Sequence, residues 1–473
     1  MEAMRILLLN APGVGLHARS SRWGGRKNRS GQFALPIFLA MAAAVLKRAG
    51  FSVNLLDAVA LNYSERELDV YLKKYPPQVI VLEVSTTSID QDSEIAFSLK
   101  KKTGAIIVFV GAHVTALPED TMRYYPADVL CIGEYEYTLV DLVNSLCNHK
   151  PLEEVAGIVF KKGKEIIATR RRELLDLDSL LFPLYESLPL ERYYDPIVRN
   201  KPCIPIRTSR GCPYHCIFCV APQVLYHHTV RYRNPEKVVD EVEHLIKLGV
   251  KEIFIDDATF TLNRKHIFSI CEELKRRKIN IDWSCFGRCD QVDEKMLVKM
   301  REAGCYMIRY GIETYDQRIL DEAKKRIKLS DIEKAFFLTK RLGMKIHATV
   351  MWGLPGESKE SIRKTLNKLK ELDPDYAQFT IATPYPGTEF FWMMKAEGRF
   401  LSNRWSDYDG SCKCVTRLDD LDPKELELYI DSAYRHFYFR PLYIWKRLSG
   451  LRRMDEFYYL MKSSFNLIKK VFL

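Results

Sequence analysis

Two successive series of short apolar segments, alternating with helical stretches, constrain the fold of this chain more than any other feature. In the first series the apolar segments are strand-like. Strands and helices in regular alternation form a parallel sheet covered on both faces, which defines the doubly wound α/β class. We therefore predict such a domain over residues 1–150. Its strands are expected at residues 5–10, 51–56, 78–84, 105–110 and 128–132, and its helices at residues 36–48, 65–74, 88–102 and 136–148.

Small and polar residues follow the strands of this predicted domain. In a parallel sheet, ligands bind beyond the carboxyl ends of the strands, where the loops approach them closely. No G-x-G-x-x-G motif follows the first strand, so a dinucleotide site is unsupported. The candidate ligand contacts of this domain are the strand-end segments at residues 10–13, 83–87, 111–113 and 133–134.

The second series begins near residue 204, after a predicted hairpin and a proline-containing linker at residues 151–200. Every gap between its strand candidates is long enough for a crossover helix, and six βα units are two short of a closed eight-stranded barrel. We therefore predict a partial, open barrel over residues 201–390, followed by a helical region at residues 391–473. The strand candidates start near residues 204, 252, 282, 306, 345 and 376.

The composition excludes several classes of protein. Hydrophobic residues make up 47% and charged residues 28% of the chain, which argues against disorder, and the net charge of +11 is too diffuse to indicate nucleic-acid binding. The longest apolar run, at residues 33–46, is too short to span a bilayer. The first residues do not resemble a secretory signal, so we expect a reducing cytosol. The twelve cysteines then serve as thiols or metal ligands rather than as disulfides.

Three cysteines follow the first strand of the predicted barrel in one short loop. They have C-x3-C-x2-C spacing, so their thiolates can face a common centre. Three ligands match a four-iron cluster with one iron left open, whereas a structural zinc site normally has four protein ligands. A zinc site would have to recruit His215, Cys203 or Cys289, and coincidental spacing is a further alternative. We favour the cluster. The three residues are Cys212, Cys216 and Cys219.

At this loop the chain resembles the radical S-adenosylmethionine (SAM) enzymes, in which C-x3-C-x2-C follows the first strand of a partial (β/α)6 barrel. An aromatic residue precedes the last cysteine in that superfamily, as Phe218 does here. The resemblance implies that Cys212, Cys216 and Cys219 are the catalytic and metal-binding residues and hold a [4Fe-4S] cluster. It also implies that the open iron binds the methionine moiety of SAM. Reduction of the cluster then cleaves SAM to a 5′-deoxyadenosyl radical.

The resemblance also implies SAM contacts after the later strands of the barrel. Family members often carry Gly-Gly-Glu after the second strand to hold the SAM amino group, whereas this chain carries two acids there. A cation after the third strand could pair with the methionine carboxylate. Each position alone could equally be a turn or a solvated charge, and the placement after successive strands favours cofactor binding. The residues concerned are Asp256, Asp257, Arg288, Glu313, Gly353 and Gly356.

The two predicted domains in this order are similar to the cobalamin-binding subclass of radical SAM enzymes, whose N-terminal domain is Rossmann-like. Residues 110–119, followed by residues 133–136, are typical of that subclass. The motif D-x-H-x-x-G, whose histidine binds cobalt from below, is absent, because His113 lacks the aspartate and the glycine. We therefore expect cobalamin without a lower ligand from the protein. The cobalamin contacts implied are Ser85, Thr86, Gly111, His113, Gly133 and Glu134.

The resemblance implies an enzyme of the group that includes the anaerobic magnesium-protoporphyrin monomethyl ester cyclase and the hopanoid-modifying enzymes. We expect it to methylate or rearrange an unactivated carbon of a hydrophobic small molecule, with an electron donor such as flavodoxin or ferredoxin. One alternative is a cobalamin-free radical SAM oxidase or cyclase. Another is a non-catalytic corrinoid- or metal-binding module, although a carrier has no need for an open-site cluster beside a barrel.

The last segment of the chain, residues 432–473, carries nine Lys or Arg against two acids, with eleven aromatic residues interleaved. One interpretation is a pair of helices that packs on the barrel. Basic and aromatic helices also suit an anionic membrane surface, which favours a lipid, isoprenoid or tetrapyrrole substrate. Nucleic acid is a weaker alternative, because no recognised binding module is present, and we expect none as a partner. We expect a cytoplasmic protein, with this segment as its contact to the inner membrane surface.

Overall fold

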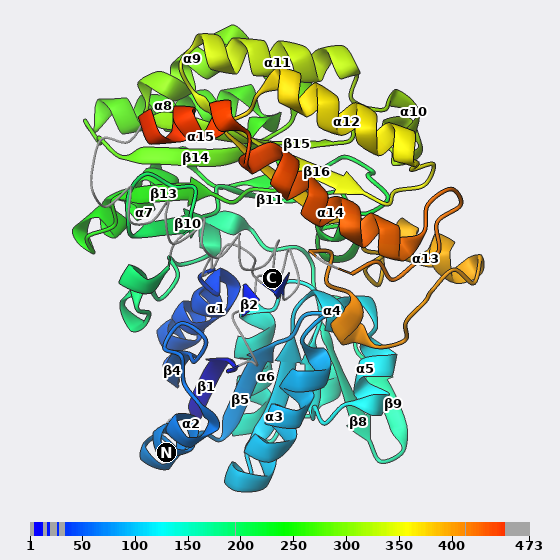
Figure 1. Ribbon diagram of the computed structural model, residues 1–473. Coiled ribbons are helices and arrows are strands. Elements are labelled where there is room, and N and C mark those ends of the chain that lie inside the picture. The colour runs from blue at the N-terminus through cyan, green and yellow to red at the C-terminus, as the bar shows by residue number, and fades with distance from the viewer. Residues whose placement is uncertain are drawn as a thin grey trace.

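Two large sheets, each with its own helices, form the body of the protein (Figure 1). The N-terminal sheet lies in the lower, blue to cyan part of the view, and the second sheet lies above it in green to yellow. This architecture confirms the predicted α/β class, with a doubly wound domain before a partial barrel. The computed structural model describes residues 4–12, 17–18, 26–27, 34–193, 195–411 and 413–449.

The N-terminal sheet has the strand order β4-β1-β5-β6-β7-β8-β9, and the first five strands in this order are parallel. Alternate side chains of β1 point to opposite faces of the sheet, as expected for a buried parallel strand. Ile6 and Leu8 enter one core cluster, and Leu7 and Leu9 enter another. The five parallel strands are β1 (Arg5–Asn10), β4 (Ser52–Asp57), β5 (Val79–Glu83), β6 (Ile106–Val110) and β7 (Val129–Cys131).

Helices cover both faces of this sheet. The helix α1 is buried over residues 37–46, because it lies between the sheet, α6 and the barrel. A helix that is apolar nearly all round is expected to be enclosed in this way. The helices are α1 (Ile37–Arg48), α2 (Glu65–Lys74), α3 (Ile89–Thr103), α4 (Ala112–Ala116), α5 (Pro118–Tyr124) and α6 (Glu136–Cys147). Two short strands, β2 (His17–Ala18) and β3 (Arg26–Lys27), pair with each other.

The predicted hairpin adds two antiparallel strands to the N-terminal sheet. These are β8 (Ile158–Lys162), which pairs with β7, and β9 (Glu165–Ala168), which pairs with β8. The sheet therefore continues past residue 150, where the sequence suggested the boundary of the domain. The linker after it contains two buried tyrosines, Tyr185 and Tyr193, and reaches the first strand of the second sheet.

The second sheet has the order β10-β13-β14-β15-β16-β17, and all its neighbours are parallel. These are the six strands expected of the open barrel. The strands are β10 (Cys203–Ile206), β13 (Glu252–Ile255), β14 (Asp282–Gly287), β15 (Cys305–Glu313), β16 (Lys345–Trp352) and β17 (Tyr376–Ile381). The helices between them are α7 (Pro235–Lys247), α8 (Arg264–Arg276), α9 (Glu294–Glu302), α10 (Gln317–Glu322), α11 (Leu329–Arg341) and α12 (Lys359–Leu372).

Up to residue 449, the α-helices that follow the barrel are α13 (Glu389–Ala396), α14 (Pro423–Tyr438) and α15 (Pro441–Ser449). The helix α14 runs along the free edge of β17 (Figure 1). The hydroxyl of Tyr438 donates to the carbonyl of Ala377 at 2.7 Å and accepts from its amide at 3.0 Å. An edge strand presents unpaired backbone groups, so this helix covers an otherwise exposed edge. The packing interpretation of the C-terminal segment holds up to residue 449, and residues 450–473 lie outside the described part.

Candidate active site

The loop that carries the three cysteines begins at a short antiparallel pair above β10. The strand β11 (Ser209–Arg210) pairs with β12 (Arg231–Tyr232), and Gly211 follows with a φ of +102°. A Cβ atom on Gly211 would lie 1.8 Å from the carbonyl oxygen of Thr229, so only glycine fits between the two segments. This close approach fixes the point at which the cysteine loop starts.

Within the loop, Cys212 and Cys216 are buried and Cys219 is half-buried. The end of the loop is held by Gln223, which lies in the short π-helix Ala221–Leu225. The side-chain amide of Gln223 donates to the carbonyl oxygens of Cys216 and Cys219 at 2.9 and 3.1 Å. The loop therefore has a defined backbone path at both ends.

Two acids at the end of β13 hold the segment that leads into the cysteine loop. The fully buried carboxylate of Asp257 accepts hydrogen bonds from the backbone amides and hydroxyls of Thr208 and Ser209, at 2.5 to 3.0 Å. Its neighbour Asp256 forms an ion pair with Arg207 at 2.6 Å. Both acids thus have a supporting role inside the protein, and their contact with the SAM amino group stays a prediction.

Buried charges lie beside the second cysteine. Lys325 donates a 2.6 Å hydrogen bond to Glu313, and Arg288 binds Asp290 through two nitrogens at 2.9 and 3.1 Å. Burial raises the pKa of Cys216, while the positive charges of Lys325 and Arg288 oppose that shift. Cations favour the thiolate, which is the form that binds metals. The pairing of Arg288 with the methionine carboxylate stays a prediction, since Asp290 already balances its charge.

The binding of a cluster by the three loop cysteines stays a prediction. Among the described residues, no three His, Cys, Asp or Glu side chains converge closely enough to hold one metal ion. In a cluster each thiolate binds a different iron, so the sulfurs stay further apart. The structure also places the three residues from which zinc would need a further ligand. Cys203 starts β10 at the opposite end of that strand, Cys289 is part of the core, and His215 stacks on His228 with ring centroids 4.0 Å apart.

The loop after β16 contains two glycines with positive φ angles. Gly353 and Gly356 have φ angles of +88° and +78°, and a Cβ on Gly353 would lie 2.8 Å from a methyl group of Leu426. The amide of Gly353 donates to Glu357, whose pKa is raised to about 7 by burial. On the loop itself, Phe218 packs partly buried in the cluster that contains Ile217 and Leu354. The SAM contacts of Gly353, Gly356, Glu313 and Phe218 stay predictions.

In the N-terminal sheet, glycines follow two of the strands at the edge that faces the barrel. Gly111 follows β6 with a φ of +113°, and a Cβ there would lie 2.7 Å from the carbonyl oxygen of Val84. Gly133 follows β7, and nothing lies within 4 Å of the Cβ it lacks. Beside them, the hydroxyl of Ser85 lies 2.9 Å from that of Ser88. The space beside Gly133 and the hydroxyl groups along this sheet edge are compatible with the cobalamin contacts expected there.

His113 is enclosed rather than free. Its side chain is 2% exposed, its Nδ1 lies 3.1 Å from the hydroxyl of Thr86, and its ring meets Trp405 edge-on at 5.2 Å. Burial lowers the pKa of His113 to about 3, so the ring is neutral at physiological pH. The expectation that this histidine is not a lower ligand stays a prediction. Cobalamin contacts by His113, Thr86 and Ser85 stay predictions.

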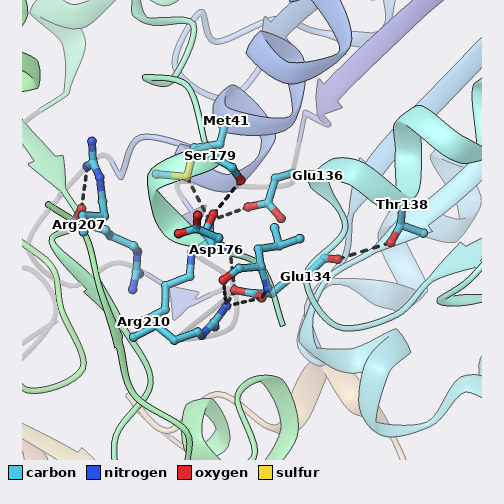
Figure 2. A network of polar contacts seen from close by, with 11 residues as sticks. Met41, Glu134, Glu136, Thr138, Asp176, Ser179, Arg207 and Arg210 are labelled. Atoms are coloured by element: carbon cyan, nitrogen blue, oxygen red, sulfur yellow. Dashed lines mark hydrogen bonds and ion pairs between the residues drawn. The ribbon is translucent and has the colours of Figure 1, made fainter. Parts of the chain in front are cut away.

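The edge of the N-terminal sheet meets the barrel directly behind the cysteine loop. The helix α4, which follows Gly111, packs through Ala112 and Ala116 on Val224 and Leu225 of the π-helix. Beside this apolar contact lies a group of buried charges (Figure 2). Arg210 of the barrel reaches both Glu134 and Glu136 of the N-terminal domain. Glu134 was expected to bind the cofactor, and its carboxylate is instead occupied by arginines; the cofactor contact stays a prediction.

Several residues of the site were not identified from the sequence. Lys325, Gln223 and Arg210 belong to no motif that marks them, since their partners lie far away along the chain. The hydroxyl of Thr259, which lies 3.5 Å from the sulfur of Cys212, follows the two predicted acids of β13. Its position just after a barrel strand was the signal available in the sequence.

Comparison with known proteins agrees with this arrangement. A family model described as the B12 binding domain matches residues 27–143, and that of the radical SAM superfamily matches residues 206–369. The two matched regions fall on the N-terminal sheet and on the open barrel.

Two curated proteins and one solved structure extend the likeness over most of the chain. An uncharacterized methyltransferase of Pyrococcus horikoshii is 30% identical over 445 residues, which cover 93% of this chain and 94% of that protein. The anaerobic magnesium-protoporphyrin IX monomethyl ester cyclase of Cereibacter sphaeroides is 29% identical and covers 88% of this chain and 69% of its own length. The solved structure is that of the radical SAM methyltransferase TsrM from Kitasatospora setae with cobalamin and a [4Fe-4S] cluster bound. It superposes on this chain with a TM-score of 0.71 at 16% sequence identity. The superposition covers 93% of this chain and 90% of that chain.

Proposed function

The chain belongs to the radical SAM superfamily, in the group with an N-terminal B12-binding domain, and on that premise we propose that it modifies an unactivated carbon of a hydrophobic small molecule. It is an enzyme of the cobalamin-dependent radical SAM methyltransferase type, with a [4Fe-4S] cluster, SAM and cobalamin as its cofactors. The proposed step is methylation, or a rearrangement of the same carbon.

One observation carries the proposal: the sheet edge and the cysteine loop that we propose to hold the two cofactors meet at a single interface. The helix α4 begins directly after Gly111, at the end of β6. It packs on the π-helix, which begins two residues after Cys219. A methyl group or a radical can pass between two cofactors only if both are held close to one substrate. This arrangement supports a reaction that uses both cofactors on one substrate.

The chain's own residues account for binding and orientation. Cys212, Cys216 and Cys219 would hold the cluster, and the edge that includes Gly111 and Gly133 would hold the corrinoid. When bound, these groups supply a carbon-centred radical from SAM and a carrier for a methyl group. Gln223 fixes the backbone of the loop, and Asp257 anchors the segment before it. The packed interface around α4 excludes water from the region between the two edges.

The inside of the barrel supports an apolar substrate. Along β13, Ile253 and Ile255 belong to the core beneath the helices, so Phe254 points to the interior face. The ring of Phe254 meets that of Phe286 edge-on at 5.1 Å. The guanidinium of Arg309 lies 4.0 Å from the centre of the same ring. Arg309 is itself paired with Asp195 at 2.7 Å, so the support for a hydrophobic substrate, such as a tetrapyrrole, isoprenoid or lipid, comes from the aromatic rings.

Oxidative cyclisation without net methylation is the second candidate. It is favoured by the 29% identity to the magnesium-protoporphyrin IX monomethyl ester cyclase, which extends over 439 residues. The cysteine loop and the barrel would serve such a reaction equally well, because both reactions start with the cleavage of SAM. The product distinguishes the two candidates.

Two partners complete the proposal. An electron donor such as flavodoxin or ferredoxin would reduce the cluster. An anionic membrane surface would receive the exposed side of α15, where Leu442 and Trp445 are 69% and 67% exposed. Within the described residues, no helix is both long and apolar enough to cross a bilayer.

Anaerobic reconstitution tests the function. We expect about four irons per chain after treatment with iron and sulfide, SAM cleavage under reducing conditions, and co-purified or added cobalamin in the protein. Mass spectrometry after turnover with tetrapyrrole, isoprenoid and lipid extracts should reveal a product heavier by one CH2 unit, because a methyl group replaces a hydrogen atom. A product lighter by hydrogens, formed without cobalamin, would favour the cyclase.

A matched cysteine variant controls this experiment. Replacing Cys212, Cys216 and Cys219 with Ala should abolish iron binding and SAM cleavage and leave the fold in place. Cys147 is only partly buried and lies outside the loop, so Cys147→Ala should retain both. Stoichiometric zinc in the reconstituted protein would contradict the proposal.

A further inference from the structure

A group of charged side chains joins the barrel to the N-terminal domain just before the cysteine loop, and Arg210, Glu134 and Glu136 of this group are buried (Figure 2). Arg210 donates to Glu134 at 2.8 Å and to Glu136 at 2.5 Å. Arg231 binds both oxygens of Glu134, at 2.8 and 2.9 Å. Arg210 and Glu136 are 2% and 1% exposed, so neither charge is balanced by solvent.

The two arginines depend on the N-terminal domain for their countercharges. Arg210 and Arg231 are direct partners in the antiparallel pair of β11 and β12, where like charges repel. Both acids come from the other domain, since Glu134 follows Gly133 and Glu136 begins α6. Among the ion pairs of the described residues, Arg210 has no carboxylate from the barrel. The geometry around Arg210 is therefore stable only when the two domains are docked.

The environment of Glu134 favours its ionised form. Burial would raise the pKa of Glu134, yet the charges and hydrogen bonds of Arg210 and Arg231 hold it below its usual range. Breaking a buried ion pair by neutralising one partner is costly, because the other charge is left without compensation. Loss of either acid would thus act first on Arg210.

A displacement of Arg210 would move the first cysteine, because the backbone between them cannot absorb it. Before Arg210, Thr208 and Ser209 are anchored by Asp257. After it, Gly211 lies against the carbonyl of Thr229 without room for adjustment. Cys212 is the next residue. On the other side of the interface, Glu134 is the neighbour of Gly133, which belongs to the edge proposed to bind the corrinoid.

We propose that Arg210 is a positioning residue, which sets the separation between the cysteine loop and the corrinoid edge through Glu134 and Glu136. The inference rests on the proposed function only for the identity of the two cofactors. It assigns these charges to the geometry between the cofactors, in addition to the stability of the fold. Loss of an acid should therefore loosen residues 208–219 and widen the range of distances between the two cofactors.

The first test needs no cofactor. Hydrogen exchange of the full chain is measured in Glu134→Gln and Glu136→Gln, which keep the size of the side chain. We expect the amides of residues 208–219 to exchange about tenfold faster than in the unchanged protein. Asp195→Asn is the matched control, because it weakens a different buried pair with Arg309 in the barrel. Exchange at residues 208–219 should be unaffected in the control.

The second test measures the cofactor geometry directly. The protein is loaded with a reduced cluster and cob(II)alamin, and their dipolar coupling is measured by pulsed EPR. We expect a shifted or broader distance distribution in Glu134→Gln and Arg210→Met at unchanged iron and cobalt content. Arg210→Lys restores the charge but not the two-pronged contact, so its distribution should lie between those of Arg210→Met and the unchanged protein. The control Asp195→Asn should match the unchanged protein.

The outcomes separate this inference from the proposed function. Unchanged exchange and unchanged distances in both glutamine variants would overturn the positioning role while leaving the function intact. If the unchanged protein binds no cobalamin, the proposed function fails, and the exchange result still decides whether Arg210 positions the loop. Should Glu134→Gln not fold, Glu136→Gln decides alone, because it leaves both bonds from Arg231 to Glu134 in place.

Discussion

Lys325 donates a 2.6 Å hydrogen bond to Glu313 beside the cysteine loop, and both side chains are buried. The backbone leaves room for this pair, since a Cβ on Gly311 would lie 2.7 Å from the Glu313 oxygen and 2.9 Å from the Lys325 nitrogen. The positive charge of Lys325 acts on Cys216, and the negative charge of Glu313 acts against it. Lys325 and Glu313 therefore act in opposite directions on the pKa of Cys216, one of the predicted cluster ligands.

The first prediction concerns the reduction potential of the cluster. A nearby cation stabilises the reduced, more negative cluster, so Lys325→Met should lower the potential and Glu313→Gln should raise it. We expect shifts of about 60 mV, which correspond to a tenfold change in a one-electron equilibrium. A redox titration followed by EPR measures the shift. The adjacent Lys324→Met is the control, because Lys324 pairs with Glu389 and its side chain is 44% exposed. Equal potentials in all three variants would refute this assignment.

The second prediction concerns pH and the closed end of the barrel. Glu252 is buried, and its pKa is raised from near 4.5 to about 7, chiefly by burial, although hydrogen bonds from Tyr306 and from the amides of Asn200 and Arg199 lower it. The folded state therefore holds a proton that the unfolded state releases. This contribution to stability is present below about pH 4.5 and is lost as the pH rises through about 7.

Glu252→Gln removes that dependence, since an amide does not titrate. Relative to the unchanged protein, we expect the variant to gain as much as about 3 kcal/mol between pH 4.5 and 7. Melting temperatures of both proteins across this range measure the gain. Tyr306→Phe removes a hydrogen bond that favours the ionised carboxylate, so it should move the transition to higher pH. If the melting temperatures of Glu252→Gln and of the unchanged protein change with pH in the same way, the raised pKa is refuted.

Much of the fold follows from local patterns in the sequence. The six strands expected in the barrel match β10 and β13 to β17, because each buried parallel strand is an apolar run followed by a long amphipathic stretch. The hairpin at β8 and β9 was predicted as well. Its pairing with β7 was not, since nothing within a hairpin specifies which sheet it joins.

The candidate site was predictable only where residues close together in the sequence form one binding site. Cys212, Cys216 and Cys219 lie within one loop, and their spacing, together with the family resemblance at this loop, predicts a cluster site. By contrast, the partners Arg210 and Glu134 are 76 residues apart, and neither has a signature that points to the other. Asp257 shows the same limit. Its place after a strand suggested a cofactor contact, and the structure shows four hydrogen bonds to Thr208 and Ser209.

The third prediction concerns the ligand below cobalt. His113 is 2% exposed, bonded to Thr86 and packed against Trp405, so we expect it not to bind the metal. The EPR spectrum of bound cob(II)alamin should be the same in His113→Phe and in the unchanged protein, without nitrogen splitting from the protein. The companion variant Trp405→Ala removes the indole that packs against the His113 ring. A nitrogen splitting that disappears in His113→Phe would show that the histidine is a ligand after all.

The fourth prediction concerns the two sides of α15. One side packs on the barrel, since the hydroxyl of Tyr443 donates to the carbonyl of Asp375 at 2.8 Å and Arg447 donates to the hydroxyl of Tyr376 at 2.9 Å. The other side carries Leu442 and Trp445, which are 69% and 67% exposed. This second side carries the exposed apolar residues proposed to contact a membrane. In the sequence, residues 450–473 add five Lys or Arg against two acids.

Liposome flotation tests this contact. The full-length protein should float with anionic vesicles at low salt and release as salt rises, because each basic residue near an anionic leaflet contributes about 1 kcal/mol. Leu442→Ser with Trp445→Ser should weaken flotation, whereas Trp392→Ser, at another exposed tryptophan on α13, should not. A chain that stops after Ser449 keeps the cover over β17 and should float poorly, whereas a stop before α14 would also expose that edge strand and confuse the result. If the full-length protein ignores anionic vesicles at low salt, the segment is structural, and the support it lends to a membrane-derived substrate is lost.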